Sequence, residues 1–141
     1  MNRRRGPSAA RNGRKDDVSN PTELAERYIA SWNERDAKKR RDLLAKTYTE
    51  TATYVDAHRD GTGYDGLSQM IAAVHERFPD AYRFRLASDV ESHHDVMRFR
   101  WEAGGIAEAP LHFGGTDVCV IAKDGRLASV TGFTDFAPKQ S

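Results

Sequence analysis

At 141 residues, with 38% hydrophobic and 9% aromatic side chains, the chain is long enough to form one domain with a single sizeable core. It nowhere approaches the roughly 18 to 20 consecutive apolar residues that a membrane span needs, and its N-terminus lacks the apolar stretch of a secretory signal. We therefore expect a cytoplasmic protein with no membrane partner.

The net charge of +1 conceals an uneven distribution. Residues 1–17 hold six basic and two acidic side chains, so residues 18–141 carry 16 basic and 19 acidic ones. We interpret residues 1–17 as a basic arm that is disordered because it has almost no large apolar residues, and residues 18–141 as the folded domain. An arginine-rich arm can also contact polyanions. The acidic body, however, does not favour a nucleic-acid partner.

Three helices are predicted in the first half of the domain. The first begins at the Asn-Pro-Thr-Glu sequence of residues 20–23, a cap followed by proline at the first helical position, and its apolar face carries Tyr28 and Trp32. A second helix covers about residues 36–46. A third covers about residues 65–78, where apolar side chains recur at helical spacing until a proline stops them.

Strand patterns fill the rest of the domain. A β-prone run begins at residue 48 and ends at Asp56, and a polar, glycine-containing loop of residues 58–63 follows it. The lone Cys119 lies in an apolar run, which indicates a buried strand cysteine and excludes an internal disulfide framework. Four later segments show either alternating apolar and polar residues or a continuous apolar run, which is typical of strands: residues 82–86, 97–101, 113–122 and 127–136. A hairpin turn at residues 123–126 joins the last two.

This order of elements predicts an α+β fold, in which three N-terminal helices pack on one face of a strongly curved, mainly antiparallel sheet. Such a sheet encloses a pocket between itself and the helices. Gly114, Gly115 and Gly132 fall inside strand patterns and suit the bends or bulges that this curvature requires.

Several motifs occur within residues 20–137: Arg27-Tyr28-Ile29 through Asp36, Tyr54-Val55-Asp56, Gly66 with its helix, Arg98-Phe99-Arg100-Trp101, Gly115-Thr116-Asp117-Val118, and Asp124-Gly125-Arg126-Leu127. Together they are similar to the motifs of the SnoaL-like, nuclear-transport-factor-2-like superfamily, which includes ketosteroid isomerases and polyketide cyclases. The resemblance implies a conical α+β barrel and a homodimer formed through the sheet, without a cofactor.

Three positions match the ketosteroid isomerase pattern in residue type. The resemblance implies that Asp56 is the general base that moves a proton between carbons, and that Tyr28 and a protonated Asp117 donate hydrogen bonds to the oxyanion. Unequal surroundings can keep one carboxyl ionised and the other neutral, for which ketosteroid isomerase is itself the standard example. Asp117 precedes an apolar run, whereas Asp56 adjoins a polar loop.

The same three residues also have structural interpretations. Tyr28 could be a core phenol, Asp56 a turn-forming or capping carboxylate, and Asp117 a strand carboxylate satisfied by backbone groups. Asp56 is followed by alanine and His58 instead of the proline common in the family, which alters the expected pocket mouth.

Seven further side chains are predicted to shape the pocket. The two tryptophans should reduce its volume, so a small ring suits it better than a steroid. The seven are Trp32, Met70, Val74, His93, Met97, Phe99 and Trp101.

Five histidines raise the question of a metal site. Adjacent residues of a strand face opposite sides, so His93 and His94 cannot both bind one metal in the pocket without a bulge, and we expect none. A single inward histidine, His93 by the parity of Met97 or less surely His112, could instead shuttle a proton. If the backbone bulges near residue 95, His94 takes that place.

We therefore predict a cofactor-independent isomerase or cyclase that acts by proton transfer on a small hydrophobic ketone or enol-type substrate. The alternative is a non-catalytic module of the same fold that binds a hydrophobic ligand or dimerises through its outer sheet face. A hydrolase of the limonene-epoxide-hydrolase type would need an arginine bridging two aspartates in the pocket. Arg98 and Arg100 alternate with apolar residues and should point away from it.

Overall fold

The computed structural model describes residues 20–78, 80, 82–104 and 112–137, so the arm predicted over residues 1–17 lies outside the described residues. No helix in the described part of the chain is long and apolar enough to cross a membrane. In chain order the described elements are α1 (Pro21–Asn33), α2 (Ala37–Thr47), β1 (Tyr48–Val55), β2 (Asp60–Thr62), α3 (Gly63–Arg77), β3 (Arg83–Leu86), β4 (Glu91–His93), β5 (Val96–Gly104), β6 (His112–Ile121) and β7 (Leu127–Phe136).

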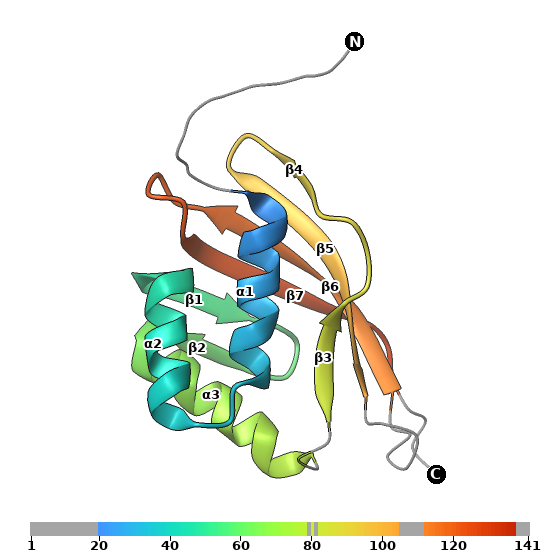
Figure 1. The fold of residues 1–141 in the computed structure, drawn as a ribbon. Helices are drawn as coiled ribbons and strands as arrows, with labels where there is room; N and C mark the ends of the chain where they lie inside the picture. The colour runs from blue at the N-terminus through green and yellow to red at the C-terminus, as the bar shows by residue number, and fades with distance from the viewer. Residues whose placement is uncertain (1–19, 79, 81, 105–111, 138–141) are drawn as a thin grey trace.

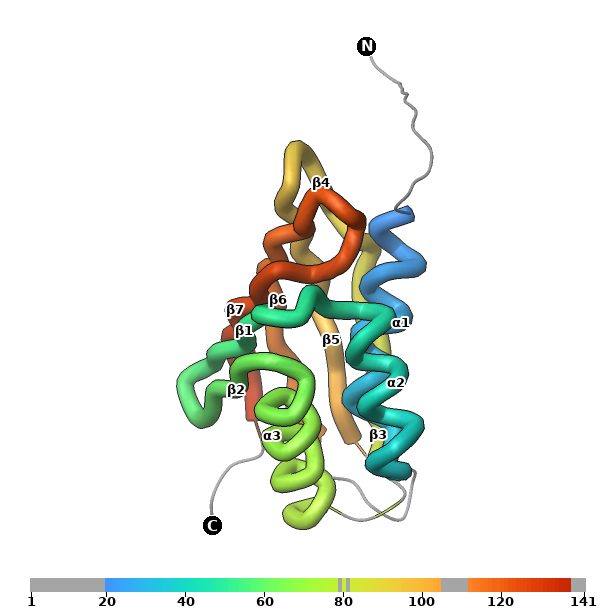
Figure 2. The backbone as a smooth tube through the Cα atoms, turned by 90° about the vertical axis from the view of Figure 1, so that its left-hand side faces the viewer, coloured from blue at the N-terminus to red at the C-terminus, as the bar shows by residue number. Residues whose placement is uncertain are grey.

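The strands form one mixed sheet in the order β2-β1-β7-β6-β5-β3, with β4 paired to the beginning of β5 (Figure 1). Only β1 and β7 run parallel among the described pairs. All three helices lie on one face of this curved sheet (Figure 2). The predicted α+β architecture is confirmed, and the cone is open because β2 and β3 remain separate edges.

Local sequence signals account for where the helices begin. The side-chain oxygen of Asn20 accepts hydrogen bonds from the backbone N–H groups of Thr22 and Glu23 at 3.0 and 3.2 Å, and Asp36 caps α2 in the same way. Helix α3 begins at Gly63, two residues earlier than predicted. The predicted loop before it contains the short strand β2, which pairs with the end of β1.

Glycines allow the close approach of β5, β6 and β7. The register of β6 against β7 shifts between Gly114 and Gly115, which confirms the predicted bulge. A side chain at Gly115 would clash with the carbonyl oxygen of Phe133 on β7. Only glycine fits there, and the resulting bend carries the ends of β6 and β7 around the helices.

The core lies between α1, α3 and the inner face of the sheet. Met97 and Phe99 belong to it, packed with Tyr28 and other fully buried side chains. Each large apolar side chain buried in this way contributes about 1.5–3 kcal/mol. Cys119 also lies in this core, as predicted, and burial raises the pKa of its thiol.

Candidate active site

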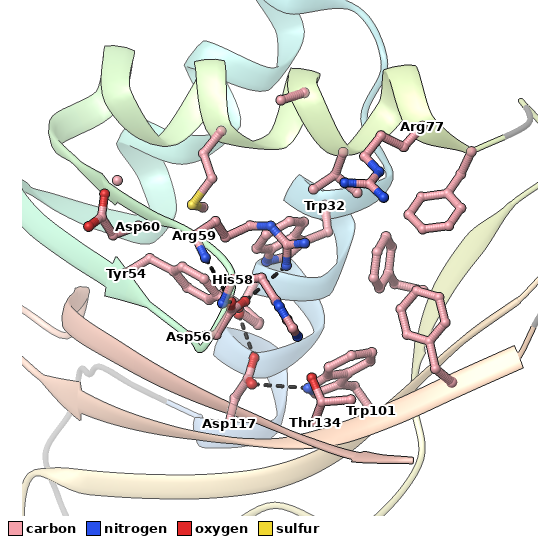
Figure 3. A pocket seen from close by; sticks show the side chains of 18 of the residues that line it. Trp32, Tyr54, Asp56, His58, Arg59, Asp60, Arg77, Trp101, Asp117 and Thr134 are labelled. Atoms are coloured by element: carbon pink, nitrogen blue, oxygen red, sulfur yellow. Dashed lines mark hydrogen bonds and ion pairs between the residues drawn. The ribbon is translucent and has the colours of Figure 1, made fainter. Parts of the chain in front are cut away.

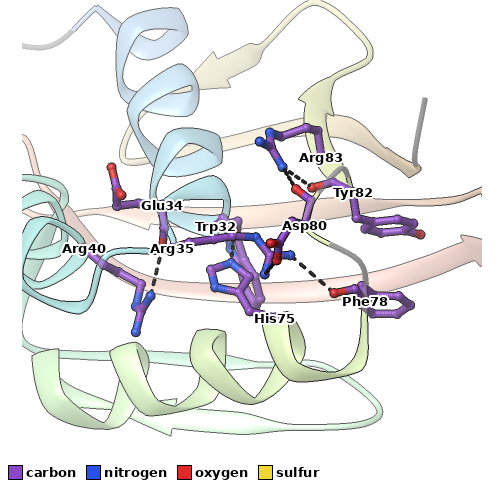
Figure 4. A network of polar contacts seen from close by, with 9 residues as sticks. All are labelled: Trp32, Glu34, Arg35, Arg40, His75, Phe78, Asp80, Tyr82 and Arg83. Atoms are coloured by element: carbon purple, nitrogen blue, oxygen red, sulfur yellow. Dashed lines mark hydrogen bonds and ion pairs between the residues drawn. The ribbon is translucent and has the colours of Figure 1, made fainter. Parts of the chain in front are cut away.

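A pocket of about 1100 Å³ opens between the helices and the inner face of the sheet (Figure 3). Side chains of α1 and α3 form one wall, and those of β3, β5, β6 and β7 form the opposite one, with the β1–β2 turn between them. Most of its apolar lining is aromatic. The aromatic side chains are Tyr28, Trp32, Tyr54, Phe78, Phe84, Trp101 and Phe113.

Asp117 supplies a buried carboxyl at the base of this pocket. Its alternation along β6 directs the side chain inward, and only 2% of the residue is exposed. Oδ2 accepts a hydrogen bond from the Tyr28 hydroxyl at 2.5 Å, and Oδ1 accepts one from Trp101 Nε1 at 3.0 Å. Two neutral donors therefore hold the carboxyl in one orientation.

Burial raises the pKa of Asp117 to about 6, against the opposing effect of the hydrogen bonds from Tyr28 and Trp101. The negative charges of Asp56 and Asp135 add to the increase. The direction agrees with the sequence-based prediction. A pKa near 6 allows both the protonated and the ionised form close to neutral pH. That the carboxyl is kept protonated stays a prediction.

Tyr28 lies fully buried on α1 beside this carboxyl. Burial and the charge of Asp117 raise the pKa of its phenol well above the usual value, so the hydroxyl stays protonated and donates to Asp117. The structure thus brings together two of the three residues matched to the oxyanion-and-base pattern. The proton of Tyr28 is directed at Asp117 and not at the open pocket.

Asp56 occupies a different kind of environment at the end of β1, although its side chain is also only 8% exposed. Its Oδ1 accepts from the backbone N–H groups of His58 and Arg59 at 2.7 and 3.1 Å. Its Oδ2 accepts from the Tyr54 hydroxyl at 2.6 Å and from Arg59 Nη1 at 3.0 Å. The turn-forming interpretation of Asp56 is therefore correct, and the same carboxylate lines the pocket.

Gly132 on β7 lies next to both carboxyl groups. A Cβ placed there would lie 2.8 Å from Asp117 Oδ1, 3.0 Å from the Tyr54 hydroxyl oxygen and 3.5 Å from Asp56 Cβ. The prediction assigned this glycine to strand curvature. The structure shows that it leaves space for Asp117 and the Tyr54–Asp56 pair to approach each other.

Four of the seven predicted pocket-shaping residues line the pocket: Trp32, Met70, Val74 and Trp101. Met97 and Phe99 do not, because they lie deeper in the core, at 1% and 2% exposure. Their inward orientation was predicted correctly, but they pack into the core, where Phe99 contacts the ring of Tyr28 on α1.

His93 was predicted to face inward by its parity with Met97, and that prediction is wrong. It is exposed on β4, where it pairs with Val96, while Ser92 pairs with Met97. Paired residues of antiparallel strands share a face, so the intervening turn at residues 94–95 reverses the expected alternation.

His94 and His112, the other two histidines considered in the prediction, are exposed. His94 is exposed in that turn with a positive φ of 52°, and its ring nitrogen lies 3.1 Å from that of His93. His112 is exposed beside Glu102. No group of three metal-binding side chains occurs among the described residues.

The structure adds pocket residues that the sequence-based prediction missed, notably Tyr54, Arg59 and Arg77. Strand alternation places Tyr54 on the same face as Asp56, and this signal could have identified it. Arg98 and Arg100 are exposed, as predicted. The prediction considered only these two arginines, and it missed Arg59, which the turn after Asp56 directs back onto that carboxylate in the pocket.

Residues 25–130 match the profile of the SnoaL-like domain, and the chain belongs to this family. A candidate isomerase of the SnoaL-like family from Agrobacterium tumefaciens strain C58 is 36% identical, with a TM-score of 0.77 over 82% of this chain and 97% of that one. No curated protein matches the chain.

Two more distant structures show the shared fold alone. One is a candidate SnoaL-like polyketide cyclase from Jannaschia sp. CCS1, with 17% identity and a TM-score of 0.63 over 86% of this chain and 91% of that one. The other has a ketosteroid isomerase-like fold, comes from Catenulispora acidiphila and was solved with trimethylamine. It shows 15% identity and a TM-score of 0.63 over 80% of this chain and 85% of that one.

Proposed function

We propose that this protein is a cofactor-independent isomerase or cyclase that transfers a proton on a small hydrophobic ketone or enol-type substrate. The observation that carries the proposal is Asp117, a buried carboxyl at the base of an aromatic pocket with a pKa of about 6. A general acid or base works best when its pKa lies near the working pH. Family membership and the similarity to a candidate isomerase support the same class of reaction.

In the proposed reaction the Asp117 carboxylate takes a proton from the carbon next to the ketone. The electron pair of the broken C–H bond moves into the enolate, whose oxygen becomes negative. Isomerisation follows when Asp117 returns the proton to another carbon of the enolate. Cyclisation follows when the enolate carbon attacks a second carbonyl carbon, whose oxygen then takes the proton.

This proposal gives Asp117 the role of base, which the resemblance implied for Asp56. The polar contacts of Asp56 hold it as a turn residue, with four donors on its two oxygens. Arg59 uses Nη1 for Asp56. We assign its remaining N–H groups, which line the same pocket, to the enolate oxygen.

Hydrogen–deuterium exchange at the α-carbon of 2-tetralone, followed by proton NMR in D₂O, tests this assignment. Wild-type protein should accelerate exchange, and Asp117→Asn should lower that rate by about 10² to 10⁴. Asp95→Asn removes an exposed carboxylate outside the pocket and should leave the rate unchanged. A large loss in Asp56→Asn with a normal rate in Asp117→Asn would restore Asp56 as the base.

The non-catalytic binding module remains the alternative function. An aromatic pocket suits a binding module as well as an enzyme. A binding module, however, does not need a carboxyl with a raised pKa such as that of Asp117. A binding module would take up 2-tetralone without accelerating exchange, and Asp117→Asn would then change neither binding nor exchange.

We also propose a homodimer through the outer face of the sheet. Val55, Thr131 and Val118 form an exposed row across β1, β7 and β6, because each pairs with the next in register. Phe133, 57% exposed, continues this patch two residues along β7. Sedimentation velocity should show a dimer for wild type and a monomer for Phe133→Asp, and a wild-type monomer at 100 μM would contradict the proposal.

A further inference from the structure

Arg77 is a positively charged side chain of the pocket that forms no ion pair with a carboxylate of the described residues. It lies in the last turn of α3 and lines the pocket. Figure 3 shows its side chain descending from α3 at the opposite end from Asp117. No described residue forms a hydrogen bond, an ion pair or a cation–π contact with it, whereas Arg59 is paired with Asp56.

The other charged side chains of the pocket lie away from Arg77. Asp56 and Arg59 compensate each other, and Asp117 is held by Tyr28 and Trp101. Asp60, exposed on β2, lies across the pocket from Arg77 in Figure 3. The pocket is therefore polarised, with carboxyl groups at the β1–β2 and β6 side and an uncompensated guanidinium at the end of α3.

A continuous run of aromatic rings connects the two ends. Phe78 follows Arg77 in the chain, and its ring centroid lies 5.6 Å from that of Phe113. The Phe113 ring lies 6.2 Å from the ring of Trp101, whose Nε1 donates to Asp117. Rings in such edge and tilted contacts form a surface that packs well against another flat ring.

We propose that the substrate is an aryl keto acid, with a carboxylate bound by Arg77, an aromatic ring on the Phe78–Phe113–Trp101 surface, and the carbon next to its ketone facing Asp117. Only the role of the ketone rests on the proposed function. An arginine binds a carboxylate through two parallel N–H groups, which fixes orientation as well as charge. Anchoring at Arg77 would place the opposite end of the ligand at the base of the pocket.

Arg77 also has a purely structural interpretation. A cation in the last turn of a helix interacts favourably with the helix dipole, and His75 occupies the same turn. In that case loss of the charge would slightly lower stability and leave ligand preference unchanged. The two interpretations therefore differ in a binding measurement.

Isothermal titration of the full chain with 4-acetylbenzoate and with its methyl ester separates them. The acid and the ester share the ring and the ketone and differ in the anionic group. Wild type should bind the acid at least about tenfold more tightly than the ester at pH 7.5. Arg77→Gln should remove this preference and leave the affinity for the ester within about twofold.

Arg100→Gln is the matched control, because it removes one exposed arginine outside the pocket and should retain the preference. Equal affinity for acid and ester, a preference that survives Arg77→Gln, or no binding of the acid at millimolar concentration would each overturn the proposal. Asp117→Asn should retain the preference for the acid. A wild-type protein that prefers the acid but never exchanges the α-protons of 2-tetralone would refute the proposed function and leave the carboxylate site intact.

Discussion

Two regions of this pocket hold the same side chain in opposite electrostatic situations. At the end of β1, Asp56 accepts hydrogen bonds from two backbone amides, a phenol and a guanidinium. On β6, Asp117 accepts from a phenol and an indole and has no cationic partner among the described residues. Both side chains are nearly buried, so burial alone does not distinguish them.

The difference shows how one fold can give two nearly buried carboxyl groups different hydrogen-bond donors. A carboxylate that forms a turn receives amide donors from its own following residues, and Arg59 adds a full positive charge. A strand carboxylate such as Asp117 receives none, because its neighbouring amides are engaged in the sheet. Desolvation then raises the pKa of Asp117 towards neutrality.

The largest expected effect comes from closing the space between the two regions. Gly132→Ala would place a methyl group against Asp117 Oδ1 and the Tyr54 hydroxyl, so one of the pairs must move. We expect a loss of about 1–3 kcal/mol in the free energy of unfolding in urea, together with loss of α-proton exchange.

Gly66→Ala is the control for this change. A Cβ at Gly66 meets only one ordinary contact, at 3.9 Å, and alanine favours the helix. Its stability should stay equal to wild type or rise by up to about 1 kcal/mol. Equal stability of the two alanine variants would show that the Asp117 and Asp56 regions are not held as tightly as described.

Much of this arrangement could be predicted from the sequence, and the failures have physical causes. Helix caps, strand alternation and family motifs gave the α+β fold, the burial of Tyr28 and the position of Asp117, because these depend on local patterns. The prediction for His93 was wrong because a hairpin turn reversed the alternation of inward and outward side chains. Arg59 was missed because a side chain after a turn can fold back onto the pocket, and residue spacing does not encode this.

The protonation of Asp117 was the harder quantity to foresee. An apolar run after the aspartate indicates burial and hence a raised pKa. The hydrogen bonds that lower this pKa come from Tyr28 and Trp101, which lie 89 and 16 residues away in the chain. Only their three-dimensional positions set the balance near 6.

A second expected effect concerns stability against pH. The pKa of Asp117 is higher in the folded state than the value of 3.8 for a free side chain, so protonation favours folding. This contribution is fully present below about pH 4 and is lost as pH rises through about 6. The unfolding free energy of wild type minus that of Asp117→Asn should fall by up to about 3 kcal/mol between pH 4 and 7. A difference independent of pH would contradict the raised pKa.

The smallest expected effect separates the two phenols. The Tyr28 hydrogen bond lowers the pKa of Asp117, so Tyr28→Phe should move the midpoint of the pH–exchange profile upward by up to about one unit. Tyr54→Phe removes one of four donors from Asp56 and should leave that midpoint within about 0.3 units. Equal shifts in both variants would mean that the carboxyl groups titrate as one unit.

The most direct test is the titration of Asp117 itself, followed by carbon-13 NMR of the side-chain carboxyl and assigned with Asp117→Asn. It needs no substrate and reports on the group that carries the proposed function. We expect a midpoint near pH 6. A midpoint at or below pH 4 would show that Asp117 is an ordinary ionised carboxylate, and the proposed acid–base role would have to be abandoned.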